Sequence, residues 1–120
     1  MKVAVIGSRG FNDYFLLSKI LKEIPGIEQI ISGGAVGADS LAAKWAKENK
    51  VDLIEHIPDY KKYGRSAPIV RNRTIVDQCD AIVAFWDGES RGTAYTIKYG
   101  ENKDKVIKKF LYRTKSQLDG

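Results

Sequence analysis

Residues 2–10 read KVAVIGSRG, a short β-branched run followed by a loop with two glycines. An apolar run of this kind is typical of a strand that helices cover on both faces of a sheet. Further along the chain, apolar runs of the strand type alternate with amphipathic stretches of the helix type. This alternation predicts right-handed β-α-β units, and therefore a mostly parallel sheet.

The pattern predicts an α/β fold with a doubly wound, five-stranded Rossmann-like sheet between two layers of helices. A single domain over residues 1–120 is expected, because this length is close to the usual size of one domain. The expected strands are Lys2–Ile6, Gln29–Ile31, Val51–Ile57, Ala81–Trp86 and Val106–Tyr112.

Capping residues and helix breakers delimit the expected helices. Pro25-Gly26 stops the first helix, and Gly100 stops the last. The charged and aromatic stretch Asp59–Gly64 is expected to be a loop. The helices are expected from the caps Asn12 and Asp13 to Pro25, at Asp39–Asn49, from the cap Ser66 to about Gln78, and at Thr93–Tyr99.

The composition excludes several kinds of chemistry. The chain has one cysteine, Cys79, and one histidine, His56, so it has neither an intrachain disulfide nor a Cys/His zinc cluster. We therefore expect a reducing, cytoplasmic environment, with no metal site and no cofactor. The first residues carry an apolar run that is too short for a signal peptide or a membrane span, so no membrane association is expected.

The charge balance favours anionic partners. Lysine and arginine number 20 against 15 acidic residues, which gives a net charge of +5. Much of this excess lies near the end of the chain, where it is either a solvated face that frays from about residue 113 or a binding patch. The basic residues of this region are Lys103, Lys105, Lys108, Lys109, Arg113 and Lys115.

Three glycine-rich loops follow predicted strands, at residues 7–10, 33–39 and 87–93. In a parallel sheet they lie at one edge, where backbone N–H groups and helix N-termini bind anions. The spacing fits neither a P-loop nor the G-x-G-x-x-G dinucleotide motif, which argues against a nicotinamide dehydrogenase. The candidate ligand-binding residues are Gly7, Ser8, Arg9, Gly33, Gly34, Gly37, Asp39, Gly88, Ser90, Arg91, Gly92 and Thr93.

Two arginines on the third expected helix add to this edge. Arg71 and Arg73 are two residues apart and so point in roughly opposite directions. We expect one to face the sheet edge and the other to face solvent or a partner chain. The alternative is that both are ordinary surface arginines.

Two carboxylates lie in the loops. Asp39 either caps a helix or contacts ribose hydroxyls, while Asp87 follows the most hydrophobic strand and is expected to be functional. In the stretch after the third strand, Tyr60 and Tyr63 are candidates for stacking on a base. Trp86, in contrast, is expected to be a core residue.

Three segments together carry a family resemblance: GSRGFND (7–13), ISGGAVGADSLAAKWA (31–46) and RNRTIVDQCDAIVAFWDGESRGT (71–93). They closely resemble the small YspA-type proteins of the SLOG superfamily, which also includes the Lonely Guy cytokinin-activating enzymes, YpsA-like proteins and the Rossmann domain of DprA. The resemblance covers roughly residues 2–100. It implies a Rossmann-like domain that binds nucleotides or nucleotide-derived ligands, often as a homodimer.

The resemblance to the enzymes of this superfamily has a gap. Gly92 and Thr93 match the Gly-Thr of their P-G-G-x-G-T-x-x-E motif, but no proline precedes them and the position of the catalytic glutamate holds Thr96. A threonine does not replace a carboxylate in acid–base catalysis. By the same resemblance, Arg71 corresponds to the catalytic arginine.

These observations favour a domain that binds or senses a nucleotide-derived small molecule. The alternative is a phosphoribohydrolase that cleaves the N-glycosidic bond of a nucleoside monophosphate, with Arg71 and Asp87 as candidate catalytic residues. A further alternative is binding to single-stranded nucleic acid. The chain lacks the interleaved aromatic and basic residues of such a groove, so a nucleic-acid partner is not expected.

Overall fold

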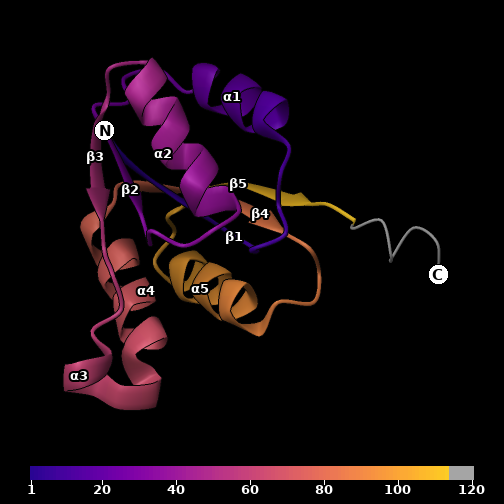
Figure 1. Cartoon of the computed structure of the whole chain (residues 1–120). Coiled ribbons are helices and arrows are strands. Elements are labelled where there is room, and N and C mark those ends of the chain that lie inside the picture. Colours follow the sequence, from indigo (N-terminus) through magenta and orange to yellow (C-terminus); the bar gives the residue numbers. More distant parts are fainter. Residues whose placement is uncertain (114–120) are drawn as a thin grey trace.

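A computed structural model describes residues 1–113 and places five parallel strands of this region in one sheet, in the order β3-β2-β1-β4-β5 (Figure 1). The doubly wound α/β fold is thereby confirmed. The part of the basic tail beyond Arg113 lies outside the described residues. The strands are β1 (Lys2–Gly7), β2 (Gln29–Ser32), β3 (Asp52–Glu55), β4 (Ala81–Trp86) and β5 (Val106–Leu111).

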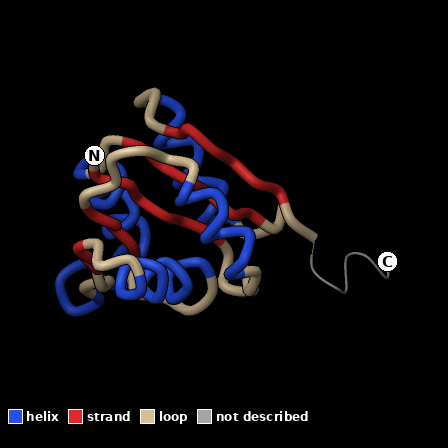
Figure 2. Tube along the Cα trace, turned by 90° about the horizontal axis from the view of Figure 1, so that it is seen from above, coloured by secondary structure: helices blue, strands red, loops and turns tan. Residues whose placement is uncertain are grey.

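Helices cover both faces of the sheet. In Figure 1, α1 and α2 lie on one side of the strands, and α4 and α5 lie on the other. Figure 2 shows the strands as a twisted layer with helices on either side. The helices are α1 (Tyr14–Lys22), α2 (Ala38–Glu48), the short α3 (Tyr60–Tyr63), α4 (Ala67–Gln78) and α5 (Arg91–Asn102).

Strand β1 shows why the sheet is buried on both faces. Val3 and Val5 pack into the core that contains residues of α1 and α2, such as Leu17. Ala4 and Ile6 point the other way, into the core that contains residues of α4 and α5. Successive side chains of a strand alternate between faces, so a continuous apolar run fills both cores.

The order of the strands creates a switch point between β1 and β4. From β1 the chain adds β2 and then β3 on one side, and α4 carries it back to place β4 on the other side of β1. The loops that leave the carboxyl ends of β1 and β4 therefore diverge to opposite faces. Ligands of doubly wound sheets bind in the crevice at such a point.

The last helix is longer than expected, because Gly100 does not end it. Helix α5 continues through Gly100 to Asn102. A Cβ at Gly100 would lie 2.5 Å from Cδ1 of Ile82 and 3.1 Å from Cγ2 of Val106. This glycine thus marks a close approach of the helix to the sheet. The expectation that it ends the helix was wrong.

Several smaller details also differ from the expectations, including strand ends that shift by one residue. Strand β3 is an edge strand that is shorter than Val51–Ile57, and its side chains are mostly exposed. The stretch Asp59–Gly64 is not simply a loop, since it contains α3 and begins a 3₁₀ turn at Gly64–Ser66. The Ser66 hydroxyl donates to the Tyr63 carbonyl at 2.7 Å and does not cap α4.

No helix within residues 1–113 combines the length and the apolar character that crossing a membrane requires.

Candidate functional site

A cavity of about 420 Å³ opens at the carboxyl ends of β1 and β4, which is the switch point of the sheet. Its size falls within the ~300–1,000 Å³ of small-molecule sites. The three glycine-rich loops all contribute to its wall, as expected from a parallel sheet. The predicted residues that line it are Gly7, Ser8, Arg9, Gly33, Asp39, Arg71, Asp87, Ser90, Gly92 and Thr93.

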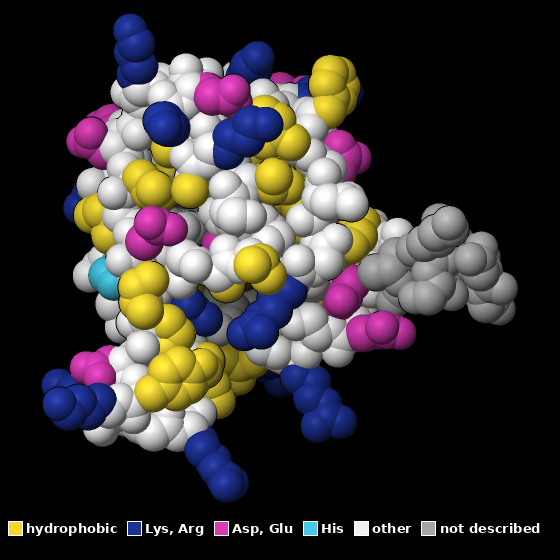
Figure 3. All heavy atoms as spheres, viewed as in Figure 1, with side chains coloured by type: hydrophobic (Ala, Val, Ile, Leu, Met, Phe, Trp, Pro, Cys, Tyr) yellow, Lys and Arg dark blue, Asp and Glu magenta, His cyan; other side chains and the backbone are white. Residues whose placement is uncertain are grey.

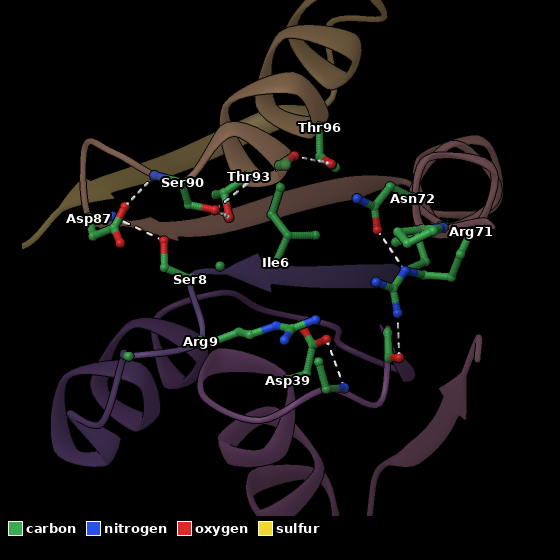
Figure 4. Close-up of a pocket in the computed structure, with 17 residues that line it drawn as sticks. Ile6, Ser8, Arg9, Asp39, Arg71, Asn72, Asp87, Ser90, Thr93 and Thr96 are labelled. Atoms are coloured by element: carbon green, nitrogen blue, oxygen red, sulfur yellow. Dashed lines mark hydrogen bonds between the residues drawn. The ribbon is translucent and has the colours of Figure 1, made fainter. Parts of the chain in front are cut away.

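The side chains enter this pocket from three directions. Figure 4 shows Arg9 and Asp39 on the side of α2, Ser90, Thr93 and Thr96 on the side of α5, and Arg71 with Asn72 on α4. The end of β1 lies between them, with Ile6 at the centre of the view. The pocket is therefore polar on its walls and has an apolar floor.

The remaining four predicted residues do not line the pocket. Arg91 is exposed at the first position of α5. Gly34, Gly37 and Gly88 have φ angles of +72°, +83° and +82°, values that side chains rarely adopt, so these glycines shape the loops. A Cβ at Gly37 would lie 2.5 Å from the carbonyl oxygens of Ser8 and Arg9, so the first two loops touch.

Asp87 organises the loop that connects β4 to α5. Its Oδ1 accepts hydrogen bonds from the backbone N–H groups of Glu89, at 2.9 Å, and Ser90, at 2.8 Å. Its own N–H donates to Oγ of Ser8 at 3.2 Å, which ties this loop to the loop after β1. Although burial raises it, the pKa of Asp87 is lowered overall by the N–H groups of Ser90 and Glu89. An ionised, hydrogen-bonded carboxylate of this kind suits loop geometry better than proton transfer.

The N-terminus of α5 faces the pocket at Gly92 and Thr93. Ser90 caps the helix, since its Oγ accepts from the Thr93 N–H at 3.5 Å and donates to Oγ1 of Thr93 at 3.1 Å. A Cβ at Gly92 would meet nothing within 4 Å, so the space in front of this residue is open. A helix N-terminus with open space before it is a favourable place for an anion.

Arg71 lies across the other end of the pocket. Its Nη1 donates to the Gly33 carbonyl at 2.6 Å and to the His56 carbonyl at 3.4 Å, and its Nε donates to Oδ1 of Asn72 at 2.7 Å. Burial lowers the pKa of Arg71, and Asp39 opposes that effect. An arginine so held stays charged and presents a fixed guanidinium to the cavity.

Asp39 is the buried acid of the site. It lies in the first turn of α2, is 9% exposed, and its Oδ2 accepts from the Ala35 N–H at 3.1 Å. Burial raises its pKa, while the N–H of Ala35 and the charge of Arg71 act in the opposite direction. Asp39 thus differs from Asp87: it is the carboxyl group whose proton is retained to higher pH.

Arg9 supplies a second cation at the pocket wall. Its side chain is exposed and makes no hydrogen bond or ion pair with another residue of the described region. Its charge lowers the pKa of Arg71, so the two cations act on the same region of space. Two positive charges that repel each other favour an anion between them.

Arg73 points away, as expected from its spacing to Arg71. Its Nε donates to the Tyr95 hydroxyl at 2.7 Å, on the outer side of α4 and α5. The single cysteine, the single histidine and Trp86 also lie outside the pocket. Cys79 is buried in the core, Nε2 of His56 pairs with Oε1 of Gln78, and Trp86 donates from Nε1 to the Ser90 carbonyl.

Thr96 lines the pocket but offers no acid. It is 2% exposed, and its hydroxyl donates to the Gly92 carbonyl of the same helix at 2.8 Å. The position that the motif resemblance matches to a catalytic glutamate therefore carries a neutral group that is bonded to its own helix.

Several lining residues were missed by the sequence reasoning. On α4 the signal was present, since positions 68, 71, 72 and 75 recur at the i, i+3, i+4, i+7 spacing of one helix face. A helix face that contains Arg71 also contains Pro68, Asn72 and Ile75. The residues missed are Ile6, Gly10, Ala35, Pro68, Asn72 and Ile75.

Comparison with known proteins agrees with the resemblance noted from the motifs. The model of the YspA, cpYpsA-related SLOG family matches residues 1–63. The Gene 61 protein of Mycobacterium phage D29 is 29% identical over 107 residues, which cover 81% of this chain and 86% of that protein. No solved structure shows a significant match.

Proposed function

The chain belongs to the YspA, cpYpsA-related SLOG family, and we propose that it binds a small nucleotide-derived anion in the pocket at the β1/β4 switch point. Membership of the SLOG family is consistent with a nucleotide-related ligand. The observation that carries the proposal is the meeting of Arg9, Arg71 and the N-terminus of α5 around one cavity of about 420 Å³.

The end of the pocket at α5 suits a phosphate group. The N-terminus of a helix carries a partial charge of about +0.5, which favours an anion. Gly92 leaves the approach open, and the hydroxyls of Ser90 and Thr93 lie beside it. Arg9 enters the same cavity from the side of α2 and has no competing partner among residues 1–113, so its guanidinium is available to an anion bound there.

The end of the pocket at Asp39 suits a sugar. A carboxylate accepts hydrogen bonds from hydroxyl groups, and Asp39 is fixed by the N–H of Ala35. Arg71, held beside it by the Gly33 carbonyl, compensates part of its charge. Cations suited to a phosphate and an acceptor suited to ribose hydroxyls thus line one cavity, which supports the proposal of a binding or sensor domain.

Thermal unfolding with AMP, ADP-ribose, NAD and cyclic nucleotides tests the proposal. A ligand at 100 times its Kd adds about 2.7 kcal/mol to the free energy of unfolding, which raises Tm by roughly 10 °C. The variant Arg9→Ala is expected to lose this shift. The matched control Arg73→Ala removes an arginine outside the pocket and is expected to keep it. An unmoved Tm with every compound would contradict the proposal.

A second candidate is hydrolysis of an N-glycosidic bond, and the buried Asp39 beside Arg71 is the observation that favours it. In this reaction water adds to C1′ of the ribose, the bond from C1′ to the base nitrogen breaks, and the base leaves with a proton. A carboxyl group whose pKa is raised by burial is better suited to donate a proton than one whose pKa is lowered. Asp39 is a better candidate for this role than Asp87, whose pKa is lowered.

Release of free adenine from AMP tests this second candidate. If the protein turns over, Asp39→Asn should abolish the release, whereas Arg73→Ala should leave it unchanged. Activity that survives Asp39→Asn but not Asp87→Asn would instead favour the carboxylate chosen from the sequence. No release above the blank would leave binding as the function.

A further inference from the structure

Three of the most exposed apolar side chains of the described region lie on the loops and the short helix that follow β2 and β3. Val36 is 64% exposed, Ile57 is 68% exposed and Tyr60 is 59% exposed. Figure 3 shows hydrophobic side chains gathered on this face of the molecule, above α3 and next to basic side chains. Apolar groups of this size in contact with water next to a polar pocket indicate a place where a ligand or partner is received.

The apolar residues are adjacent to the pocket through Gly34 and Arg71. A Cβ at Gly34 would lie 2.7 Å from Cδ1 of Ile57, so Ile57 covers the backbone next to Gly33. The carbonyl of His56, one residue before Ile57, accepts from Nη1 of Arg71 at 3.4 Å. The chain from β3 to α3 thus passes along the side of Arg71 that faces away from α5.

A second, smaller cavity of about 120 Å³ has one lining residue in common with the first. Arg71 lines both cavities, so its side chain stands between them. The walls of the smaller cavity combine the apolar or aromatic residues Ile57, Tyr63, Ala67 and Val70 with the polar residues His56, Asp59, Arg71 and Thr74. Ile57 and the polar pocket therefore meet at the guanidinium of Arg71.

We propose that this apolar surface, formed by Ile57 and Tyr60 beside Arg71, is the subsite for the aromatic base of a nucleotide whose phosphate and ribose occupy the pocket. The inference rests on the proposed function. It adds that the ligand carries an aromatic base besides its phosphate and ribose. Aromatic bases stack on tyrosine rings and on the planar guanidinium of arginine, and this stacking does not select one base. The subsite therefore favours nucleotides over sugar phosphates without reading the identity of the base.

The surroundings favour an anionic ligand over an apolar one. Lys61 and Lys62 are exposed on α3 directly after Tyr60, the acid Asp59 directly precedes it, and Tyr60 is near enough to Arg71 to affect the pKa of that guanidinium. Positive charge near an aromatic side chain attracts the phosphate of a ligand, while the aromatic ring stacks on its base. The larger polar pocket next to this surface has room for the phosphate and the ribose of such a ligand.

Calorimetric titration with AMP, GMP, CMP and UMP, each compared with ribose 5-phosphate, tests the subsite. The nucleotides are expected to bind about 5- to 150-fold more tightly than ribose 5-phosphate, the range for one base stacked on an aromatic side chain. Tyr60→Ala should remove most of this difference and leave the affinity for ribose 5-phosphate unchanged. Tyr60→Phe should retain it, because the ring remains.

Phe15→Ala is the matched control, since it removes an aromatic side chain that is 82% exposed on α1. It should leave all five affinities unchanged. If ribose 5-phosphate and the four nucleotides bind equally well to the wild-type protein, the base subsite is wrong while the anion pocket stands. If none of the five compounds binds, the proposed function and the subsite fall together. A difference that Tyr60→Ala and Phe15→Ala leave equally intact also overturns the assignment to Tyr60.

Discussion

Arg71 reaches the pocket across Gly33, and only a residue without a side chain fits beneath it. Nη1 of Arg71 donates to the Gly33 carbonyl at 2.6 Å. A Cβ at Gly33 would lie 2.5 Å from that nitrogen and 2.8 Å from Oδ2 of Asp39. The missing side chain at position 33 therefore allows a cation and a carboxylate to occupy the same end of the pocket.

Gly33→Ala is expected to displace Arg71 or Asp39. Inserting a methyl group into so close a contact costs about 1–3 kcal/mol of unfolding free energy. Affinity for ribose 5-phosphate should fall as well, because the guanidinium moves. Urea unfolding and calorimetry measure the two effects. Gly92→Ala is the control for stability, since a Cβ there meets no atom within 4 Å. A Gly33→Ala protein as stable as wild type would contradict the importance of this contact.

Gly92→Leu separates ligand binding from stability. The residue lies in the first turn of α5, where leucine is a better helix former than glycine by up to about 1 kcal/mol. We expect the free energy of unfolding to be unchanged or higher. The longer side chain enters the open space of the pocket, so binding of ribose 5-phosphate and AMP should be lost. Unchanged binding would place the phosphate elsewhere.

Arg71→Lys compared with Arg73→Lys tests whether the fork of the guanidinium matters. Arg71 uses Nη1 and Nε on two different acceptors, Gly33 and Asn72, and an ammonium group does not reproduce this geometry. We expect Arg71→Lys to lose about 1–2 kcal/mol of stability and to weaken AMP binding at least about tenfold. Arg73→Lys, two residues away and outside the pocket, should change neither quantity by much. Equal effects of the two substitutions would argue against the special position of Arg71.

The pH dependence of stability should reveal the buried Asp39. Burial raises its pKa above the ordinary value of 3.8, so ionisation favours the unfolded chain. The stability contributed by protonated Asp39 is complete below this value and is lost as pH rises through the raised pKa. Asp39→Asn, which keeps an acceptor for the Ala35 N–H, should therefore gain stability relative to wild type with rising pH. A constant difference between about pH 4 and 8 in urea unfolding would refute this expectation.

Asp87 should show the opposite sign. Burial raises its pKa, but the N–H groups of Ser90 and Glu89 lower it overall below the ordinary 3.8. The stability contributed by ionised Asp87 is present above that value and is lost as pH falls through the lowered pKa. Asp87→Asn should cost about 1 kcal/mol near neutral pH, and the cost should shrink in acid. The same urea series measures both variants, and a cost that grows in acid would contradict the hydrogen bonding of Asp87.

The sheet could be predicted because a strand that is buried on both faces has a continuous apolar sequence. The apolar runs in β1 and β4 are continuous, and β4 begins and ends at Ala81 and Trp86 as expected. Residues whose type is determined by tertiary packing gave a misleading signal. Gly100 reads as a helix stop, yet the reason for its lack of a side chain is the nearness of Ile82 across the core.

The part of the site that follows from the topology, the meeting of the three loops at one edge of the sheet, could be predicted from the sequence. Parallel strands bring three loops to one edge, so most of the chosen loop residues meet in one cavity. The roles of the two acids were not readable, because an aspartate in a first helical turn usually faces solvent. Only the fold shows that Asp39 is buried under the loop of Gly33, and that Asp87 is occupied by the N–H groups of Ser90 and Glu89.

Gly37 also makes the pocket wall a single mechanical unit. Its Cα is packed against the carbonyl oxygens of Ser8 and Arg9 so closely that no methyl group fits, and Gly37 is the N-cap of α2. The backbone that presents Arg9 is therefore in direct contact with the start of α2. A ligand bound to Arg9 would rest on a loop that packs against this helix, on the opposite face of the sheet from α4 and α5.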